Sequence, residues 1–247
     1  MDSKSPPIHF VIPCAGVGAR SGRDKPKPKQ YVDLAGEPMI AHTLGAILQV
    51  ESVQTICLVV SPSDAYIDDI LLNHIKRHQE KIFVVRRGGD TRAQSVLAGL
   101  EHLRSAGVSN NAWVLVHDAA RCLITPELIN HLINTCSADA VGGLLAIPVS
   151  DTLKQERSGR VQSTLTREHK WAAQTPQMFK LAILSQALEQ GLQSDSWTIT
   201  DESSAIETLG LQPILALGHS TNLKITFAED FELAQALLMA RSQKIDT

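Results

Sequence analysis

Short apolar runs rich in β-branched residues alternate, over the first 150 residues, with segments whose apolar residues recur at helical spacing. Continuous apolar runs are typical of parallel strands that are covered on both faces. The predicted strands are Phe10–Pro13, Thr55–Val60, Ile82–Val85, Trp113–Val116 and Val141–Ile147. The alternation therefore predicts an α/β fold with a doubly wound, mostly parallel twisted sheet, in which ligands bind beyond the carboxyl ends of the strands.

The segments between these strands carry helix signals, and the pattern continues less regularly to the end of the chain. Pro126 stands at a first-turn position that favours proline, and Ser61–Asp64 supplies capping residues. The predicted helices are Pro38–Leu48, Asp64 to His78, Thr91–Ser105, Pro126–Cys136, Leu181–Gln190, Asp201–Leu209 and Ala228–Arg241, and two late strands are predicted at Pro213–Leu217 and Leu223–Ile225. With 247 residues, 43% of them hydrophobic, the chain can bury one substantial core, so we expect residues 1–247 to form a single domain.

Residues 149–173 interrupt the alternation with a polar stretch. Two short alternating pieces, Asp151–Lys154 and Val161–Leu165, flank a turn at Arg157–Arg160. This pattern predicts a two-stranded β-arm that protrudes from the main sheet. Because an isolated hairpin is marginally stable in water, we expect the arm to pack against a second copy of the chain and to serve for dimerisation.

The first predicted strand leads into a glycine turn and then into a basic stretch. Gly16, Gly18 and Gly22 allow a ligand to approach bare N–H groups. Five cations follow within ten residues, namely Arg20, Arg23, Lys25, Lys27 and Lys29. This order favours a site for a nucleoside triphosphate, although a surface loop with solvated lysines gives the same pattern. The spacing G-x-G-x-x-x-G departs from the dinucleotide fingerprint, and the absence of G-K-[ST] excludes a P-loop.

Charge and composition exclude several other classes of protein. The net charge is −3, so the cations form a local patch and we expect no nucleic-acid partner. No apolar stretch approaches the ~20 residues of a membrane span, and the start lacks the apolar core of a signal peptide. The four cysteines show no C-x-x-C spacing, which favours buried thiols in a cytoplasmic protein. His74 and His78 have a metal-ligand spacing but lack H-E-x-x-H, so we expect a solvated helix face.

The ends of the predicted strands bring together cations, small residues and one acid. They supply Gly88–Asp90, Asp118–Arg121, Ser150–Thr152 and Lys224. Asp118 follows an apolar strand directly, a position suited to Mg²⁺ or to a ribose, or to capping a helix; we assign His117 no catalytic role. No Ser/His/Asp or Cys/His group and no carboxylate pair can be assembled. A phosphate monoester needs no general base as a nucleophile, because its second pKa of about 6 leaves it mostly dianionic at neutral pH.

Taken together, these residues resemble the family of 2-C-methyl-D-erythritol 4-phosphate cytidylyltransferases of non-mevalonate isoprenoid synthesis. The matching pieces span nearly the whole chain in the family's order. They are Pro13–Arg20, Pro28–Tyr31, Gly88–Gly99, Val116–Arg121, Asp151–Thr152, Thr175–Gln177, Thr200–Glu202 and Asn222–Thr226. The resemblance implies a Rossmann-like nucleotidyltransferase that joins CTP and methylerythritol phosphate to give a CDP-alcohol and pyrophosphate, with Mg²⁺ or another divalent cation.

The resemblance also implies roles for individual residues. Arg20 and Lys29 would hold the triphosphate, and Asp118 would serve the metal and substrate region together with the catalytic Lys224. The CTP-binding residues would be Cys14, Ala15, Gly16, Gly18, Gly89, Asp90 and Ser95. The acceptor-binding residues would be Arg121, Thr152, Arg167, Thr175, Thr200 and Lys224. In this family the arm, and with it Arg167, reaches into the neighbouring subunit's site, which implies a homodimer with arm exchange.

The sequence leaves some alternatives open. The Arg20-to-Lys29 loop is about two residues longer than usual for the family, so Lys27 is the alternative to Lys29. Cys14 stands where a second alanine is common, and Cys122 where a proline is common. Another acceptor polyol phosphate, such as ribitol 5-phosphate, would use the same CTP residues. A non-catalytic nucleotide-binding regulator is the reading from a different class, but it predicts loss of Arg20, Lys29 or Lys224, and all three are present.

Overall fold

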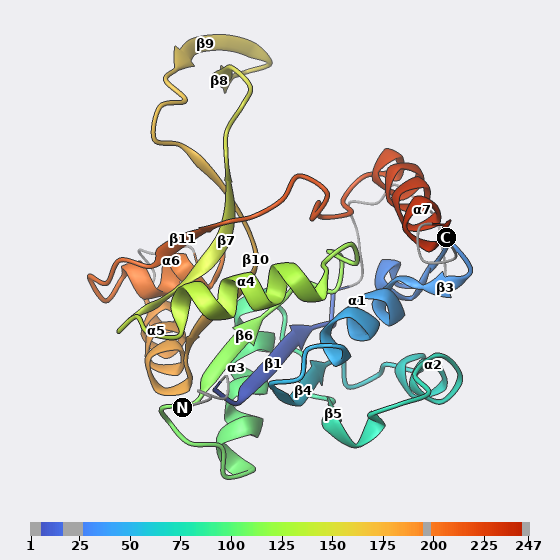
Figure 1. Ribbon diagram of the computed structural model, residues 1–247. Helices are drawn as coiled ribbons and strands as arrows, with labels where there is room; N and C mark the ends of the chain where they lie inside the picture. Colours follow the sequence, from blue (N-terminus) through green and yellow to red (C-terminus); the bar gives the residue numbers. More distant parts are fainter. Residues whose placement is uncertain (1–5, 17–26, 195–198, 244–247) are drawn as a thin grey trace.

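A seven-stranded sheet runs through the centre of the computed structural model, which describes residues 6–16, 27–194 and 199–243 (Figure 1). The strands lie in the order β11 (Ile214–Leu217), β7 (Gly142–Pro148), β10 (Trp171–Lys180), β6 (Trp113–Val116), β1 (Ile8–Pro13), β4 (Val53–Val59) and β5 (Ile82–Val85). Neighbouring strands are parallel except around β10, which is antiparallel to both β6 and β7. The predicted doubly wound, mostly parallel sheet is confirmed.

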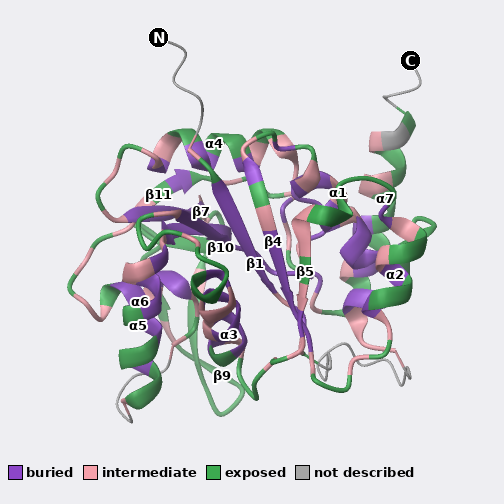
Figure 2. Ribbon diagram, turned by 90° about the horizontal axis from the view of Figure 1, so that it is seen from below, coloured by how far each residue is buried: buried purple, intermediate pink, exposed green. Residues whose placement is uncertain are grey.

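Helices cover both faces of this sheet and bury its strands, which Figure 2 shows as a buried layer. One face packs against α1 (Met39–Leu48), α2 (Ile67–His74) and α4 (Pro126–Cys136), and the other against α3 (Arg92–Ser105), α5 (Leu181–Gln193) and α6 (Glu202–Glu207). Side chains alternate along each strand: in β1, Phe10 and Ile12 join the first cluster and Val11 the second. A third cluster lies between the turn after β6 and α7 (Ala228–Gln243).

Local capping explains where several helices begin. Thr91 accepts from the Gln94 N–H, and the Gln94 side chain accepts from the Thr91 N–H, which makes a capping box at the start of α3. Thr125 caps α4, with Pro126 in its first turn, and Asp201 caps α6. These caps place the first turns of α3 and α6 beside the carboxyl ends of the parallel strands.

Sequence patterns predicted the arm but not the strand that follows it. The arm is a separate hairpin of β8 (Leu153–Arg157) and β9 (Arg160–Leu165), joined by Ser158 and Gly159, both at positive φ, as type I′ turns require. In Figure 1 it projects away from the sheet. The predicted boundary at Ala173 is wrong, because Trp171–Ala173 already pair with β7. Pro176 and the polar residues around it hid β10, since proline is unusual inside a central strand.

Other differences are small. Leu223–Ile225 is not a strand, because Ile225 makes one backbone hydrogen bond to Ala120 and has no pairing strand. Helix α2 ends at His74 rather than His78, and Asp64 accepts hydrogen bonds from N–H groups at its start. The short elements η1 (Lys29–Tyr31), β2 (Asp33–Leu34), β3 (Glu37–Pro38) and η2 (Gln79–Lys81) were not predicted, because two or three residues give no periodicity.

Two predictions from composition can be compared directly with the structure. All four cysteines are buried and free, as expected. Among the described helices, none combines the length and the apolar character that a membrane crossing requires.

Candidate active site

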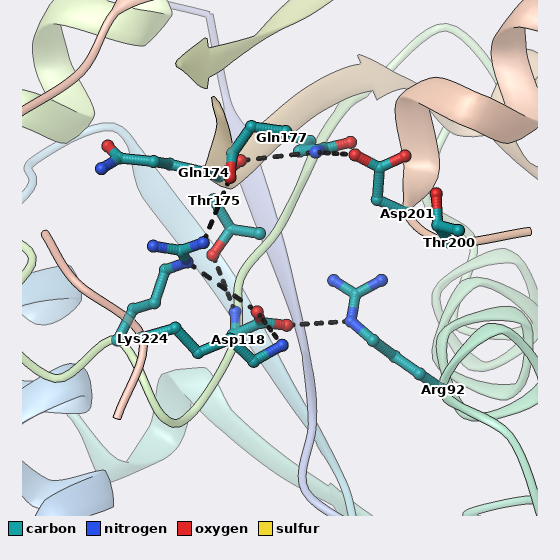
Figure 3. Close-up of a pocket in the computed structure, with 10 residues that line it drawn as sticks. Arg92, Asp118, Gln174, Thr175, Gln177, Thr200, Asp201 and Lys224 are labelled. Atoms are coloured by element: carbon teal, nitrogen blue, oxygen red, sulfur yellow. Dashed lines mark hydrogen bonds and ion pairs between the residues drawn. The ribbon is translucent and has the colours of Figure 1, made fainter. Parts of the chain in front are cut away.

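A cavity of about 270 Å³ opens beyond the carboxyl ends of the parallel strands, at the place where the fold predicts ligand binding. Its walls come from the start of α3, the turn after β6, the middle of β10, the start of α6 and the segment before α7 (Figure 3). The lining residues are Arg92, Asp118, Arg121, Ala173, Gln174, Thr175, Gln177, Thr200, Asp201 and Lys224. Five predicted site residues, Asp118, Arg121, Thr175, Thr200 and Lys224, are therefore brought together.

Asp118 lies at the centre of the charges in this cavity. Its Oδ1 accepts from Arg92 Nε at 2.8 Å, and its Oδ2 lies 2.8 Å from Lys224 Nζ and 3.9 Å from Arg121 Nε. Burial alone would raise the pKa of the Asp118 carboxyl, but the charges of Arg92, Lys224 and Arg121 outweigh burial and hold that pKa well below its usual value. Asp118 is therefore a permanent anion that organises cations.

The Thr175 hydroxyl is fixed by two neighbours on the turn after β6. It accepts a hydrogen bond from the Asp118 N–H at 3.0 Å and lies 3.0 Å from His117 Nδ1. His117 Nε2 lies 3.2 Å from the Arg121 carbonyl oxygen, which can only accept, so Nε2 carries the proton and Nδ1 accepts from Thr175. Burial lowers the pKa of His117 to about 4, so the ring is neutral at pH 7. Thr175 is thus left with one lone pair, which can accept from a ligand hydroxyl.

Arg121 ties two segments of the cavity wall together. Its Nη1 donates to the Asn222 carbonyl oxygen at 2.7 Å and its Nη2 to the Ala173 carbonyl oxygen at 3.3 Å. Its Nε is buried and has no hydrogen-bond partner among the described residues. Most of the fork is therefore engaged by backbone, which holds the segment that carries Lys224 against β10.

The described residues predicted to bind CTP come together at the carboxyl ends of β1 and β5. Cys14–Gly16 follow β1 and Gly88–Asp90 follow β5, and the two turns touch, because a Cβ on Gly88 would lie 2.2 Å from Ala15 Cβ. The Gly89 N–H donates to Ser95 Oγ at 3.1 Å. Gln30 Nε2 donates to the carbonyl oxygens of Cys14 and Gly16, at 2.7 and 3.2 Å. Gly18 and Arg20 lie outside the described residues.

The two candidate lysines of the basic stretch point to different places. Lys29 Nζ donates to the Ile225 carbonyl oxygen at 2.9 Å, next to Lys224. Lys27 Nζ lies 5.9 Å from the centre of the Tyr66 ring, beside α2. The structure therefore brings Lys29, and not Lys27, to the segment that lines the cavity.

The two predicted site residues on or beside the arm are not brought to this cavity. Thr152 and Arg167 are exposed and lie outside its lining, and Arg167 Nη1 donates to the Ser150 carbonyl oxygen. Within one chain, the acceptor-binding set is therefore divided between the cavity and the arm.

The predicted metal role of Asp118 does not fit this geometry. Both of its oxygens face cations at 2.8 Å, and the described residues hold no group of three or more His, Cys, Asp or Glu side chains placed to bind a metal. A divalent ion on Asp118 would displace Lys224 or Arg92. In this arrangement both oxygens of Asp118 are taken up by cations, and Asp118 is not assigned as a metal ligand.

Three charged residues at the site were missed from the sequence: Arg92 and Asp201, which line the cavity, and Glu202 beside them. Arg92 lines the cavity, and its Nη1 and Nη2 hold the fully buried Glu202 at 2.6 and 3.1 Å. One signal was available: Arg92 opens a helix, where the macrodipole disfavours a cation, so a nearby anion was required. Nothing in the sequence indicated that Glu202 would be buried.

Comparison with known proteins identifies one family. A sequence model described as IspD, 2-C-methyl-D-erythritol 4-phosphate cytidylyltransferase, matches residues 8–240. The chain is 47% identical over 229 residues to a protein of that name from Laribacter hongkongensis, covering 92% of this chain and 94% of the relative. It is 49% identical over 238 residues to a bifunctional enzyme IspD/IspF from Albidiferax ferrireducens, covering 96% of this chain and only 54% of that enzyme.

Solved structures agree with this relationship. A crystal structure of 4-diphosphocytidyl-2C-methyl-D-erythritol synthase matches with a TM-score of 0.81 and 35% identity, covering 94% of this chain and 99% of the other. The Francisella tularensis 2-C-methyl-D-erythritol 4-phosphate cytidylyltransferase matches with a TM-score of 0.76 and 31% identity, covering 92% and 98%. The chain belongs to the family of 2-C-methyl-D-erythritol 4-phosphate cytidylyltransferases, which are nucleotidyltransferases.

Proposed function

We propose that this chain transfers the cytidylyl group of CTP to 2-C-methyl-D-erythritol 4-phosphate, with release of pyrophosphate. The observation that carries the proposal is the cavity in which Arg92, Arg121 and Lys224 surround Asp118, beside the two touching turns at residues 14–16 and 88–90. Cations next to backbone-lined turns are suited to bringing two phosphates together. The family relationship supplies the substrates.

The acceptor phosphate is the attacking group in this proposal. One of its oxygens forms a bond to the α-phosphorus of CTP while the bond to the bridging oxygen breaks, and the electron pair leaves with pyrophosphate. The dianionic phosphate needs no deprotonation. Other groups are unsuited to the role: burial raises the pKa of the Cys14 thiol, and both nitrogens of His117 are engaged.

Repulsion between the two anions is then the main obstacle, and cations address it. Lys224 lies on the segment before α7, and Lys29 donates to the neighbouring Ile225 carbonyl oxygen. The two lysines would flank the reacting phosphates. Arg20 remains the proposed partner of Lys29 at the triphosphate. Thr175 would accept a hydrogen bond from one acceptor hydroxyl through its remaining lone pair, and Thr200 would hydrogen-bond to another. Arg121 would hold the wall against which the acceptor lies.

Nucleotide choice is proposed to come from the turns. Gly89 and Asp90 would face the cytosine edge, with Ser95 holding the Gly89 N–H and Cys14–Gly18 following the nucleotide on the other side. Mg²⁺ or another divalent cation is proposed to accompany the phosphates of CTP, with no carboxylate of this chain assigned to it. We also propose a cytoplasmic location, which buried free thiols support.

A homodimer with arm exchange completes the proposal. Thr152 and Arg167 lie away from the cavity of their own chain, the arm exposes Val161 and Leu165, and Trp171 at the start of β10 is exposed beside it. Exposed apolar residues on an isolated hairpin favour contact with a second copy. Arg167 of one chain would then reach the acceptor phosphate in the other chain's cavity.

The test is pyrophosphate release from CTP with purified protein and each candidate acceptor. We expect turnover with 2-C-methyl-D-erythritol 4-phosphate, loss of turnover on chelation of divalent cations, and strong preference for CTP over UTP, because a site built for an amino donor leaves polar groups unpaired against a carbonyl. Faster turnover with ribitol 5-phosphate would move the activity to another polyol phosphate. Binding of CTP without turnover on any acceptor would indicate a regulator.

A further inference from the structure

Arg92 is held by more carboxylate contacts than any other described cation of the cavity, and it joins three distant parts of the chain. It opens α3, contacts Asp118 after β6 through Nε, and holds Glu202 at the start of α6 through both terminal nitrogens. Its side chain is 27% exposed, whereas those of Asp118 and Glu202 are 10% and 1% exposed. The guanidinium is therefore held by two buried carboxylates, and Arg92 also lines the cavity.

Glu202 is the least solvated charge in this group. Among the described residues it has a single cationic partner, Arg92, whereas Asp118 has three. Burial consequently raises the pKa of Glu202 despite its contact with Arg92. A buried carboxylate with one partner is a weak contributor to stability, since desolvation offsets most of the attraction, so stability alone gives a poor account of its presence.

The contacts run from Glu202 through Arg92 and Asp118 to Lys224, a series we call the contact series. Lys224 lies on an irregular segment with no strand or helix to fix it, and its side chain is 43% exposed. Its ammonium is held at 2.8 Å by Asp118 Oδ2, while Arg92 occupies the other oxygen of the same carboxylate. The orientation of Asp118, and with it the place of the Lys224 ammonium, thus depends on where Arg92 is held.

We propose that Glu202 and Arg92 are positioning residues for the transfer reaction, which act on Lys224 through Asp118. Glu202 fixes the guanidinium fork, the fork takes one oxygen of Asp118, and the other oxygen then directs Lys224 toward the reacting phosphates. This inference rests on the proposed function for its kinetic consequence, but the contacts themselves make a prediction that needs no turnover.

The kinetic experiment measures Glu202→Gln in the native chain and in a Lys224→Ala background. Glutamine keeps the shape and a hydrogen-bond acceptor but removes the charge. We expect Glu202→Gln to lower kcat/KM for the acceptor about tenfold in the native chain and less than about twofold in the background, since residues that act through one another are not additive. The matched control is Glu101→Gln on the same helix α3, which breaks the ion pair with Arg87 in the turn before that helix; neither residue lines the cavity, and kcat/KM should change little.

An equal further loss in the Lys224→Ala background would overturn the proposal, because the effect would then not pass through Lys224. If Glu202→Gln fails to fold, Arg92→Lys replaces it, since lysine keeps the charge but cannot hold both carboxylates; the same loss and the same non-additivity are expected. A folded variant with native kcat/KM would also overturn it.

A second measurement separates this inference from the proposed function. Acylation of individual lysines by a water-soluble anhydride, followed by peptide mass spectrometry, reports how firmly the Lys224 ammonium is held. We expect Lys224 to react severalfold faster in Glu202→Gln, with Lys154 on the arm unchanged as internal reference. If the native protein shows no turnover but Lys224 is more reactive in Glu202→Gln, the proposed function fails and the contact series from Glu202 to Lys224 stands. Equal reactivity of Lys224 in Glu202→Gln and in the native protein refutes the contact series.

Discussion

The cavity and the arm carry halves of one predicted acceptor site, yet they are built in opposite ways. In the cavity, Thr175 and Arg121 are buried or nearly so, and each is held by two or more contacts from distant segments. Just after the arm, the Arg167 side chain is exposed and, among the bonds described, contacts only the Ser150 backbone carbonyl. The difference teaches that one chain preorganises the cavity by itself, whereas the arm lacks the packing that would fix its side chains.

The largest effect should come from separating the two halves on different chains. Lys29→Ala and Arg167→Ala should each lower kcat by about a hundredfold or more, as loss of a charge-stabilising donor does. If the arm serves the partner's cavity, mixing and re-equilibrating the two variants makes heterodimers with one intact site, and equal mixing should restore about a quarter of native activity.

Native mass spectrometry gives the heterodimer fraction against which the recovered activity is plotted. Subunit exchange without recovery would show that the arm serves its own chain. Lys29→Ala mixed with Lys224→Ala is the matched control, because both lesions lie on the body; in that pair no heterodimer site is intact, so no recovery is expected.

The second effect concerns pH and stability, and it contrasts a buried histidine with an exposed one. The pKa of His117 is lowered to about 4 in the folded chain, against about 6.5 when unfolded. Below pH 6.5 the unfolded state binds a proton that the folded state does not, so the unfolding free energy falls as the pH drops toward 4, by about 3 kcal/mol in all.

Denaturant unfolding at pH 7 and at pH 4 measures this change. His117→Asn should remove that part of the pH dependence, even though it lowers stability overall. His169→Asn is the control on the arm, where the side chain is 93% exposed, and it should leave the pH dependence as it is. An equal effect of both substitutions would contradict the burial of His117.

The third effect is on substrate binding at Thr175. Thr175→Val keeps the shape but removes the hydroxyl, which leaves the Asp118 N–H without its acceptor. We expect kcat/KM for the acceptor to fall about tenfold, in line with a buried group left unpaired, while Thr175→Ser should stay within about twofold. If serine does not preserve activity relative to valine, the hydroxyl is not the functional group.

The smallest effect should distinguish the single chain from the dimer. Val161 on the arm is 64% exposed within one chain, so Val161→Ser should change the free energy of unfolding of the monomer by less than about 0.5 kcal/mol. In an arm-exchanged dimer the same side chain would be buried, and the dimer dissociation constant should rise severalfold, as measured by sedimentation. An unchanged dissociation constant would place Val161 outside the dimer contact.

The elements that the sequence predicted well are those whose signals are local. The strand run at β4 and the start of helix α3 near Thr91 depend on neighbours a few residues apart, and the structure confirms both. Strand β10 was missed because its pairing with β6 and β7 overrides the proline and polar residues in its sequence.

The same contrast between local signals and long-range contacts holds for the site. Asp118, Thr175 and Lys224 could be named from motifs, and the structure brings them to one cavity. What motifs could not supply is the partner of each charge: Arg92 meets Glu202 across 110 positions of sequence, and Lys29 meets Ile225 across 196. Such contacts are set by the packing of the sheet, and no local pattern encodes them.

The continuity of β10 has a consequence for the spacing of two sites. The same strand carries Thr175 in the cavity and runs out to the arm at Trp171, four residues earlier, with Arg167 another four residues beyond. Eight residues of extended chain span at most about 29 Å. If arms are exchanged, this backbone limits the separation of the two reaction centres of a dimer to roughly that distance plus the reach of one arginine.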